Sequence, residues 1–151
     1  VKKLAVVPRI DSAKSSIDLD TVSAVISGRF HVMADYARRV IHTVHREELR
    51  NAAGAKRKIL RPTRRLLVRD ESLMDDRQLH ALERGLELSS ALAVVYEYRR
   101  QLQQIFLQRS ATQERLLAQL QEWCRRAEAT GIAALEDFAA SIRCYTLAAN
   151  A

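Results

Sequence analysis

Glycine and proline are scarce in this chain: its 151 residues contain 4 Gly and 2 Pro. Both residues usually mark turns and breaks, so the chain has few places at which it can reverse direction. Alanine, leucine, arginine, glutamine and glutamate, which are abundant, all favour helices. No segment alternates apolar and polar residues as a half-buried strand would. The sequence therefore predicts an all-α fold.

Cysteines and long apolar runs are also rare. The 2 cysteines, Cys124 and Cys144, form no C-x-x-C pair, which excludes a metal ribbon and a disulfide scaffold and favours a reducing, cytosolic setting. The longest uncharged apolar stretch, 88–96, is less than half of the about 20 residues that a membrane-spanning helix needs. The amino terminus lacks a signal-peptide pattern. We therefore expect a chain that neither spans a membrane nor is exported by itself.

The amino-terminal half carries one long helical pattern. From 18 to about 51, apolar residues recur in steps of three and four, which is typical of an amphipathic helix. Asp18 and Asp20 stand where they could cap its start. A basic connector follows at 56–72, and Pro62 predicts a helix break near Arg61, because its ring blocks helical continuation.

Four ordinary helices are expected after the connector, and their short connections predict an antiparallel four-helix bundle. The first spans about 75–88, and the second begins at Ser89 or Ser90. The third begins with a capping-box pattern of Ser110 and Gln113 and ends at Gly131, and a fourth closes the chain. The predicted parts are 1–55, 56–72 and 73–151.

No complete catalytic or metal site is evident. His42 and His45 are three residues apart and could share a helix face, but two ligands do not make a metal site, so we interpret them as polar residues beside an arginine-rich face. The adjacent carboxylates Glu47 and Glu48 would point about 100° apart on a helix, away from any common substrate. No nucleophile elbow or glycine-rich phosphate loop is present. We therefore assign no catalytic residue, no metal ligand and no small-molecule site.

Positive charge is concentrated in the first half, where residues 1–75 hold 16 Lys/Arg against 9 Asp/Glu, whereas residues 76–151 hold 9 of each. The stretch 56–69 predicts an anionic-surface-binding site, since it has no acidic residue and seven basic ones: Lys56, Arg57, Lys58, Arg61, Arg64, Arg65 and Arg69. By composition alone, a lipid leaflet and a phosphate backbone would serve equally well as partner. Interleaved aliphatic residues favour the lipid interface: Leu60, Leu66, Leu67 and Val68.

Several segments resemble a known family. They are "IDLDTVSAVISGRFHVMADYARRV", "VYEYR", "QEWCRRAEATGI" and the near-terminal "CYTL". In these segments the chain resembles the carboxy-terminal cytosolic portion of bacterial integral-membrane fatty-acid desaturases of the acyl-CoA type. The resemblance implies a whole enzyme that introduces a double bond into a fatty acyl chain with a di-iron centre, dioxygen and an electron donor.

The histidine boxes of that family are missing from this chain, which has no H-x-x-x-H and no H-x-x-H-H. No iron ligand or catalytic residue can therefore be transferred, and we expect the chain to hold no cofactor and to be inactive alone. Its start at Val1 would suit a piece of a longer reading frame. As partners, the resemblance implies the remainder of the desaturase and anionic lipid of the inner leaflet, at the cytoplasmic side of the inner membrane.

An alternative family shares other segments: "LLVRDESL", "VYEYRRQL" and "GIAALEDFAASI" are similar to the carboxyl region of some insertion-sequence transposases, where an all-helical part accompanies a DDE-type nuclease. This alternative implies DNA as the partner of the basic stretch. The ending at Ala151 weighs against it, because such transposases continue into a segment with the final catalytic acid. We take the desaturase as the main hypothesis, the transposase as the alternative, and a helical interaction module without chemistry as a third.

Overall fold

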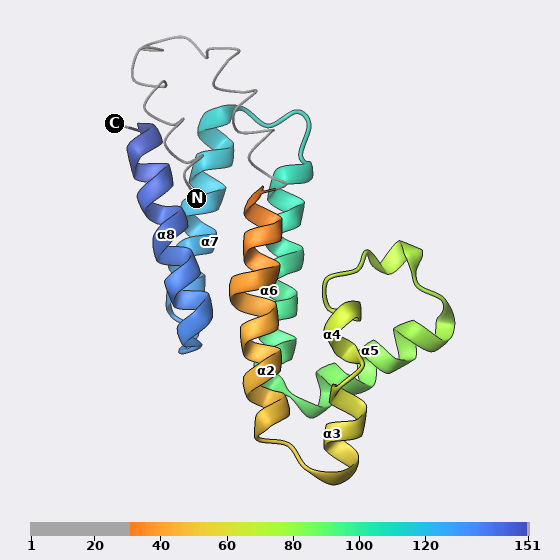
Figure 1. The fold of residues 1–151 in the computed structure, drawn as a ribbon. Coiled ribbons are helices and arrows are strands. Elements are labelled where there is room, and N and C mark those ends of the chain that lie inside the picture. The colour runs from red at the N-terminus through yellow and green to blue at the C-terminus, as the bar shows by residue number, and fades with distance from the viewer. Residues whose placement is uncertain (1–30, 151) are drawn as a thin grey trace. The chain divides into compact units, whose positions relative to one another are not determined.

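The computed structural model describes the backbone of residues 31–150 and the side chains of residues 31–143. The all-α prediction is confirmed, because this part of the chain forms helices and contains no strand. Figure 1 shows the principal helices, with these bounds: η2 (Ala37–Ile41), α2 (His42–Arg50), α3 (Gly54–Leu60), α4 (Thr63–Leu66), η3 (Glu71–Leu73), α5 (Asp76–Leu88), α6 (Ser90–Leu107), α7 (Gln113–Glu128) and α8 (Ala133–Asn150).

The chain is helical from residue 31 to Arg50, which is the later part of the helix predicted for 18–51. The rest of that prediction, with the caps Asp18 and Asp20, lies outside the described residues. A π-helical turn, η2, interrupts the α-helical hydrogen bonding between residue 31 and Arg50. The neighbouring residues Val40 and Ile41 of this turn are both buried.

The basic connector is itself largely helical. The predicted break is confirmed: α3 ends at Leu60, Arg61 closes it, and α4 begins after Pro62. Proline has no N–H to donate to the preceding turn, but its fixed φ suits the start of a new helix. The chain therefore turns within the basic stretch and presents its charges from two short helices.

Side-chain caps set the starts of the later helices. The Asp75 side chain accepts a hydrogen bond from the Gln78 N–H, and the Gln78 side chain accepts one from the Asp75 N–H, which gives α5 a complete capping box. The predicted cap of α7 is wrong. Thr112, whose backbone is extended, accepts from the Arg115 N–H, so α7 begins two residues later than a cap at Ser110 would place it.

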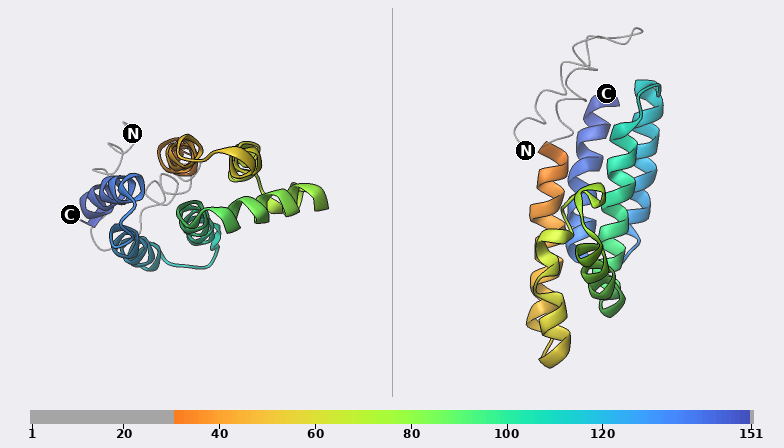
Figure 2. Two further views of the ribbon diagram at one scale, coloured as in Figure 1. Left: turned by 90° about the horizontal axis from the view of Figure 1, so that it is seen from below. Right: turned by 90° about the vertical axis from the view of Figure 1, so that its right-hand side faces the viewer.

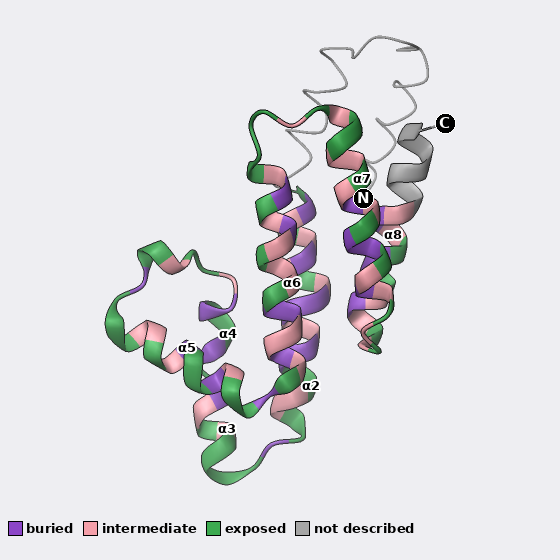
Figure 3. Cartoon of the chain, turned by 180° about the vertical axis from the view of Figure 1, so that it is seen from behind, coloured by how far each residue is buried: buried purple, intermediate pink, exposed green. Residues whose placement is uncertain are grey.

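The chain divides into two compact units, which we describe separately. The unit 36–99 contains α2 to α5 and the start of α6, and α3 and α4 both contact α5 (Figures 1 and 2). Its core includes Tyr36, whose hydroxyl donates to the Val95 carbonyl at 2.6 Å. Buried residues follow the inward faces of the helices, as Figure 3 shows.

The other unit is described from 31–35 and from 100 onward, and it contains the α7–α8 pair, whose helices lie side by side (Figure 2). Trp123 meets Phe138 edge to face, with ring centroids 6.2 Å apart, which is a favourable geometry for an aromatic pair. Gly131 takes φ +81° in the turn between them, which is the left-handed conformation expected from the sequence. Arg143 and Glu128 form an ion pair across the two helices at 2.8 Å.

Candidate nucleic-acid interface

Six of the seven predicted basic residues form an exposed surface on α3, α4 and the turns beside them. None of the six forms an ion pair with another described residue, and we call them the basic surface: Lys56, Lys58, Arg61, Arg64, Arg65 and Arg69. Arg69 donates one long hydrogen bond, of 3.3 Å, to the Leu73 carbonyl. Six uncompensated cations within fourteen residues produce a strongly positive potential.

Arg57 departs from the predicted set. Its side chain is half-buried, and its Nη1 donates to the Leu49 carbonyl at 2.5 Å. That carbonyl lies in the last turn of α2 and also accepts a backbone hydrogen bond of 3.2 Å from the Ala52 N–H. The negative end of the helix favours a cation there. Arg57 therefore closes α2 and is excluded from the basic surface.

The interleaved leucines correct the lipid interpretation. Leu60, Leu66 and Leu67 are buried in the unit 36–99, and Val68 is half-buried. Side chains packed in a core cannot also insert into a lipid layer. Their burial instead turns the intervening Lys and Arg side chains outward, so the alternation of charge and leucine is that of an amphipathic protein surface.

The Leu60 carbonyl accepts two side-chain hydrogen bonds that hold the α3–α4 turn, from which the basic surface extends. It accepts a hydrogen bond of 2.6 Å from the Thr63 hydroxyl and one of 2.7 Å from Nε2 of His45, which therefore carries the ring proton. All three residues are buried. His45 is thus a structural residue that ties α2 to the α3–α4 turn, and its Nε2 is not available to a metal ion.

Replacing His45 with alanine should lower the free energy of unfolding by about 1–3 kcal/mol, because a buried hydrogen bond and part of the core are lost together. Urea unfolding followed by far-UV circular dichroism would measure the change. His80→Ala is the matched control, since His80 is exposed on α5 and should cost little. Equal losses in the two variants would contradict the structural role of His45.

His42 lies on α2, as His45 does, and its imidazole is affected by the charge of Arg64. Burial lowers the pKa of its imidazole, and the positive charge of Arg64 lowers this pKa further. The imidazole is therefore neutral at pH 7, because even its ordinary pKa of 6.5 lies below that pH.

Gly85 brings α5 against α4. A Cβ atom placed on it would lie 2.4 Å from Cγ2 of Thr63, so only glycine allows this approach.

At the carboxyl end of the basic stretch 56–69, Nη2 of Arg99 donates to the Val68 carbonyl at 3.0 Å. Sequence reasoning missed both contacts, although a glycine inside a helical pattern is a signal of close packing.

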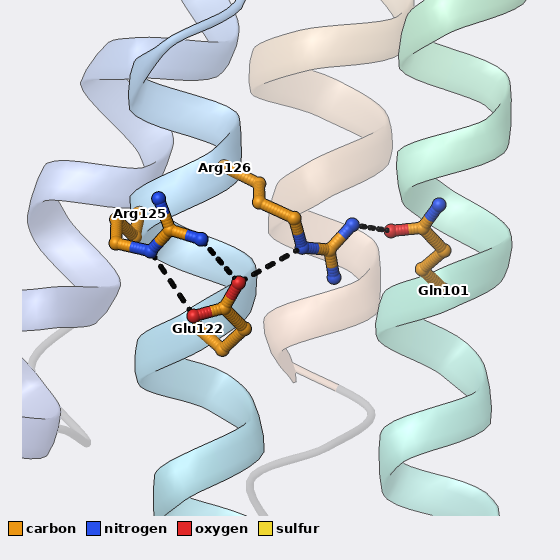
Figure 4. A network of polar contacts seen from close by, with 4 residues as sticks. All are labelled: Gln101, Glu122, Arg125 and Arg126. Carbon is orange, nitrogen blue, oxygen red and sulfur yellow. Dashed lines mark hydrogen bonds and ion pairs between the residues drawn. The ribbon is translucent and has the colours of Figure 1, made fainter.

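Acidic and thiol groups offer no catalytic arrangement in the described part of the chain. Glu122 is held between Arg125, at 2.5 Å, and Arg126, at 3.6 Å, and Arg126 also donates to Gln101 (Figure 4). Burial raises the pKa of the Cys124 thiol to about 12, so this thiol stays protonated. Between residues 31 and 143, no three His, Cys, Asp or Glu side chains gather as metal ligands would.

Comparison with known proteins identifies a transposase family. The family model for transposases of the DDE ISL3 type matches residues 20–148. The chain is 34% identical over 125 residues to the transposase for insertion sequence element IS1001 from Bordetella parapertussis, which covers 80% of this chain and 30% of that relative. No solved structure matches.

These matches correct the main hypothesis of the sequence analysis. The desaturase resemblance is wrong, and so are the partners and the inner-membrane location that it implied. The di-iron centre of a longer enzyme was expected only because of the desaturase resemblance, so that expectation is withdrawn. Among the described residues, no helix is both long and apolar enough to cross a membrane. Since the transposase model covers most of its length, this chain belongs to the DDE transposase family of the ISL3 type.

Proposed function

We propose that this chain is a DNA-contacting helical part of an insertion-sequence transposase, with the basic surface as the part that meets DNA. The observation that carries the proposal is the set of exposed cations on α3, α4 and the adjoining turns that no described carboxylate neutralises. Family membership supplies the partner, since a transposase acts on DNA. The chain spans 30% of the length of its relative, so the proposal concerns binding by this part only.

The physical reason is counterion release. Each Lys or Arg that neutralises a DNA phosphate frees condensed cations into solution, and this gain falls as the salt concentration rises. Side chains that already had carboxylate partners would have to exchange them for phosphate and would gain less. The basic surface makes no such exchange, because none of its members is paired to a described carboxylate.

We also propose, from the sequence pattern, that the chain consists of one long amphipathic helix, a basic connector and an antiparallel four-helix bundle, with parts 1–55, 56–72 and 73–151. DNA binding does not depend on that arrangement, because the basic surface lies entirely within the unit 36–99.

The test is DNA binding by the whole chain, measured by fluorescence anisotropy with a short labelled duplex at about 50 mM salt. The double variant Arg64→Gln/Arg65→Gln should lose about tenfold or more in affinity, because two phosphate contacts are removed. The control is Arg109→Gln/Arg115→Gln, which removes the same charge from exposed positions outside the basic surface and should change affinity much less. The proposal is wrong if the unaltered chain does not bind, or if both double variants bind equally well.

A further inference from the structure

We infer that the basic surface grips the sugar–phosphate backbone of duplex DNA and does not read its base sequence. This inference rests on the proposed function and goes further, because it names the form of DNA and the atoms that are contacted. It also implies that recognition of a particular DNA sequence is not supplied by α3 and α4.

The chemistry of the surface lacks groups that discriminate bases. Between 53 and 69, the exposed residues are the six basic ones together with Ala53, Gly54, Ala55 and Pro62. None of these carries an amide, a hydroxyl or an aromatic ring. The hydroxyl of this segment, on Thr63, is buried and committed to the Leu60 carbonyl. Adenine is normally read by Asn or Gln, so this surface has no group for it.

Arginine can read guanine through a bidentate contact, so the directions of the side chains matter. Arg64 and Arg65 are adjacent on α4, and adjacent helical side chains point about 100° apart. Lys56 and Lys58 on α3 are two residues apart and also diverge, and lysine acts as a point charge without a planar fork. Divergent cations match phosphates spread along a backbone better than the edge of one base pair.

The same chemistry favours duplex over single-stranded DNA. Proteins that hold single strands stack the bases on aromatic side chains, and each stacked base is worth about 1–3 kcal/mol. No Phe, Tyr or Trp occurs between residues 51 and 95. A duplex, in contrast, presents two phosphate strands at high charge density to a rigid array of cations.

The surface is rigidly built, which suits a fixed array of phosphates. The α3–α4 turn is held from beneath by the two hydrogen bonds to the Leu60 carbonyl. Arg99 holds the carbonyl of Val68 at the far end. The cations therefore extend from a scaffold whose backbone is already fixed, so binding orders side chains alone.

The experiment compares an AT-rich duplex, a GC-rich duplex of equal length and the corresponding single strands, using the whole chain and anisotropy between about 50 and 200 mM salt. We expect affinities for the two duplexes to agree within about threefold and the single strands to bind more weakly. With six contacts, log K should fall against log salt with a slope of about −5, and Arg64→Gln/Arg65→Gln should reduce the slope by about 2.

Two kinds of failure can be told apart. Absence of duplex binding, or binding that Arg64→Gln/Arg65→Gln leaves unchanged, overturns the proposed function and the inference together. Binding that this variant weakens, but that prefers one duplex by more than about tenfold or prefers single strands, overturns the inference alone. Asn51→Ala is the added control, because Asn51 is an exposed amide beside the surface and its loss should leave the affinity unchanged. Melting curves of each variant would verify that it is folded.

Discussion

Replacing Trp123 with alanine is expected to lower the free energy of unfolding by about 3–5 kcal/mol. The indole is fully buried between α7 and α8, where it meets the edge of the Phe138 ring. Truncation removes most of the buried apolar area at that point and leaves a cavity which the neighbouring helices fill only in part. Loss of the aromatic pair adds to the cost.

The measurement is urea unfolding followed by far-UV circular dichroism, because Trp123 is the single tryptophan and its removal abolishes the intrinsic indole signal. Leu107→Ala is the control on the same unit, since Leu107 is 49% exposed at the end of α6. That change should cost less than about 1 kcal/mol. If Trp123→Ala were as mild as the control, the α7–α8 core would not depend on this side chain.

Replacing Gly85 with alanine is expected to destabilise the unit 36–99 by up to about 2 kcal/mol. Alanine favours a helix over glycine by about 1 kcal/mol, so propensity alone predicts a gain. The new Cβ would lie 2.4 Å from Cγ2 of Thr63, however, and forcing extra volume into a packed core costs about 1–3 kcal/mol. Thr63 is buried and bonded to the Leu60 carbonyl, so it cannot move aside cheaply. We therefore expect the clash to outweigh the propensity.

A double-mutant cycle isolates this contact. Thr63→Ser removes Cγ2 and keeps the hydroxyl that bonds to Leu60, so Gly85→Ala should cost clearly less in the Thr63→Ser background. Because α4 carries Arg64 and Arg65, duplex affinity should fall with Gly85→Ala and recover partly in the double variant. If Gly85→Ala costs the same in both backgrounds, the contact between α4 and α5 does not limit the packing.

Local signals predicted most of the helices. The predicted start of the helix near residue 75 and that of the next helix at Ser89 or Ser90 are confirmed, and Pro62 predicted the break between α3 and α4. The cap of α7 was mispredicted because Ser110 and Thr112 carry equivalent hydroxyls, and backbone geometry selects between them. Local chemistry determines that a helix begins, whereas the surrounding chain determines the residue at which it does so.

The family was misassigned for a related reason. Segments such as "VYEYRRQL" consist of residues that many amphipathic helices share, and the desaturase and transposase hypotheses both used them. The leucines between the basic residues of 56–69 favoured a lipid interface over DNA as the predicted partner. Their burial in the unit 36–99 removes that argument, since an aliphatic side chain contributes to one apolar environment at a time.

The sequence by itself determined that this protein is helical and that its positive charge is concentrated at 56–69, because helical periodicity and formal charge are properties of neighbouring residues. Only the tertiary structure decided which of those charges are available. It buried Leu60, Leu66 and Leu67, used Arg57 to close α2, and left the other six cations of 56–69 exposed and without a carboxylate partner among the described residues. Those outcomes depend on contacts of α3 and α4 with α2 and α5, far apart in the chain, such as the bond from His45 and the close approach at Gly85.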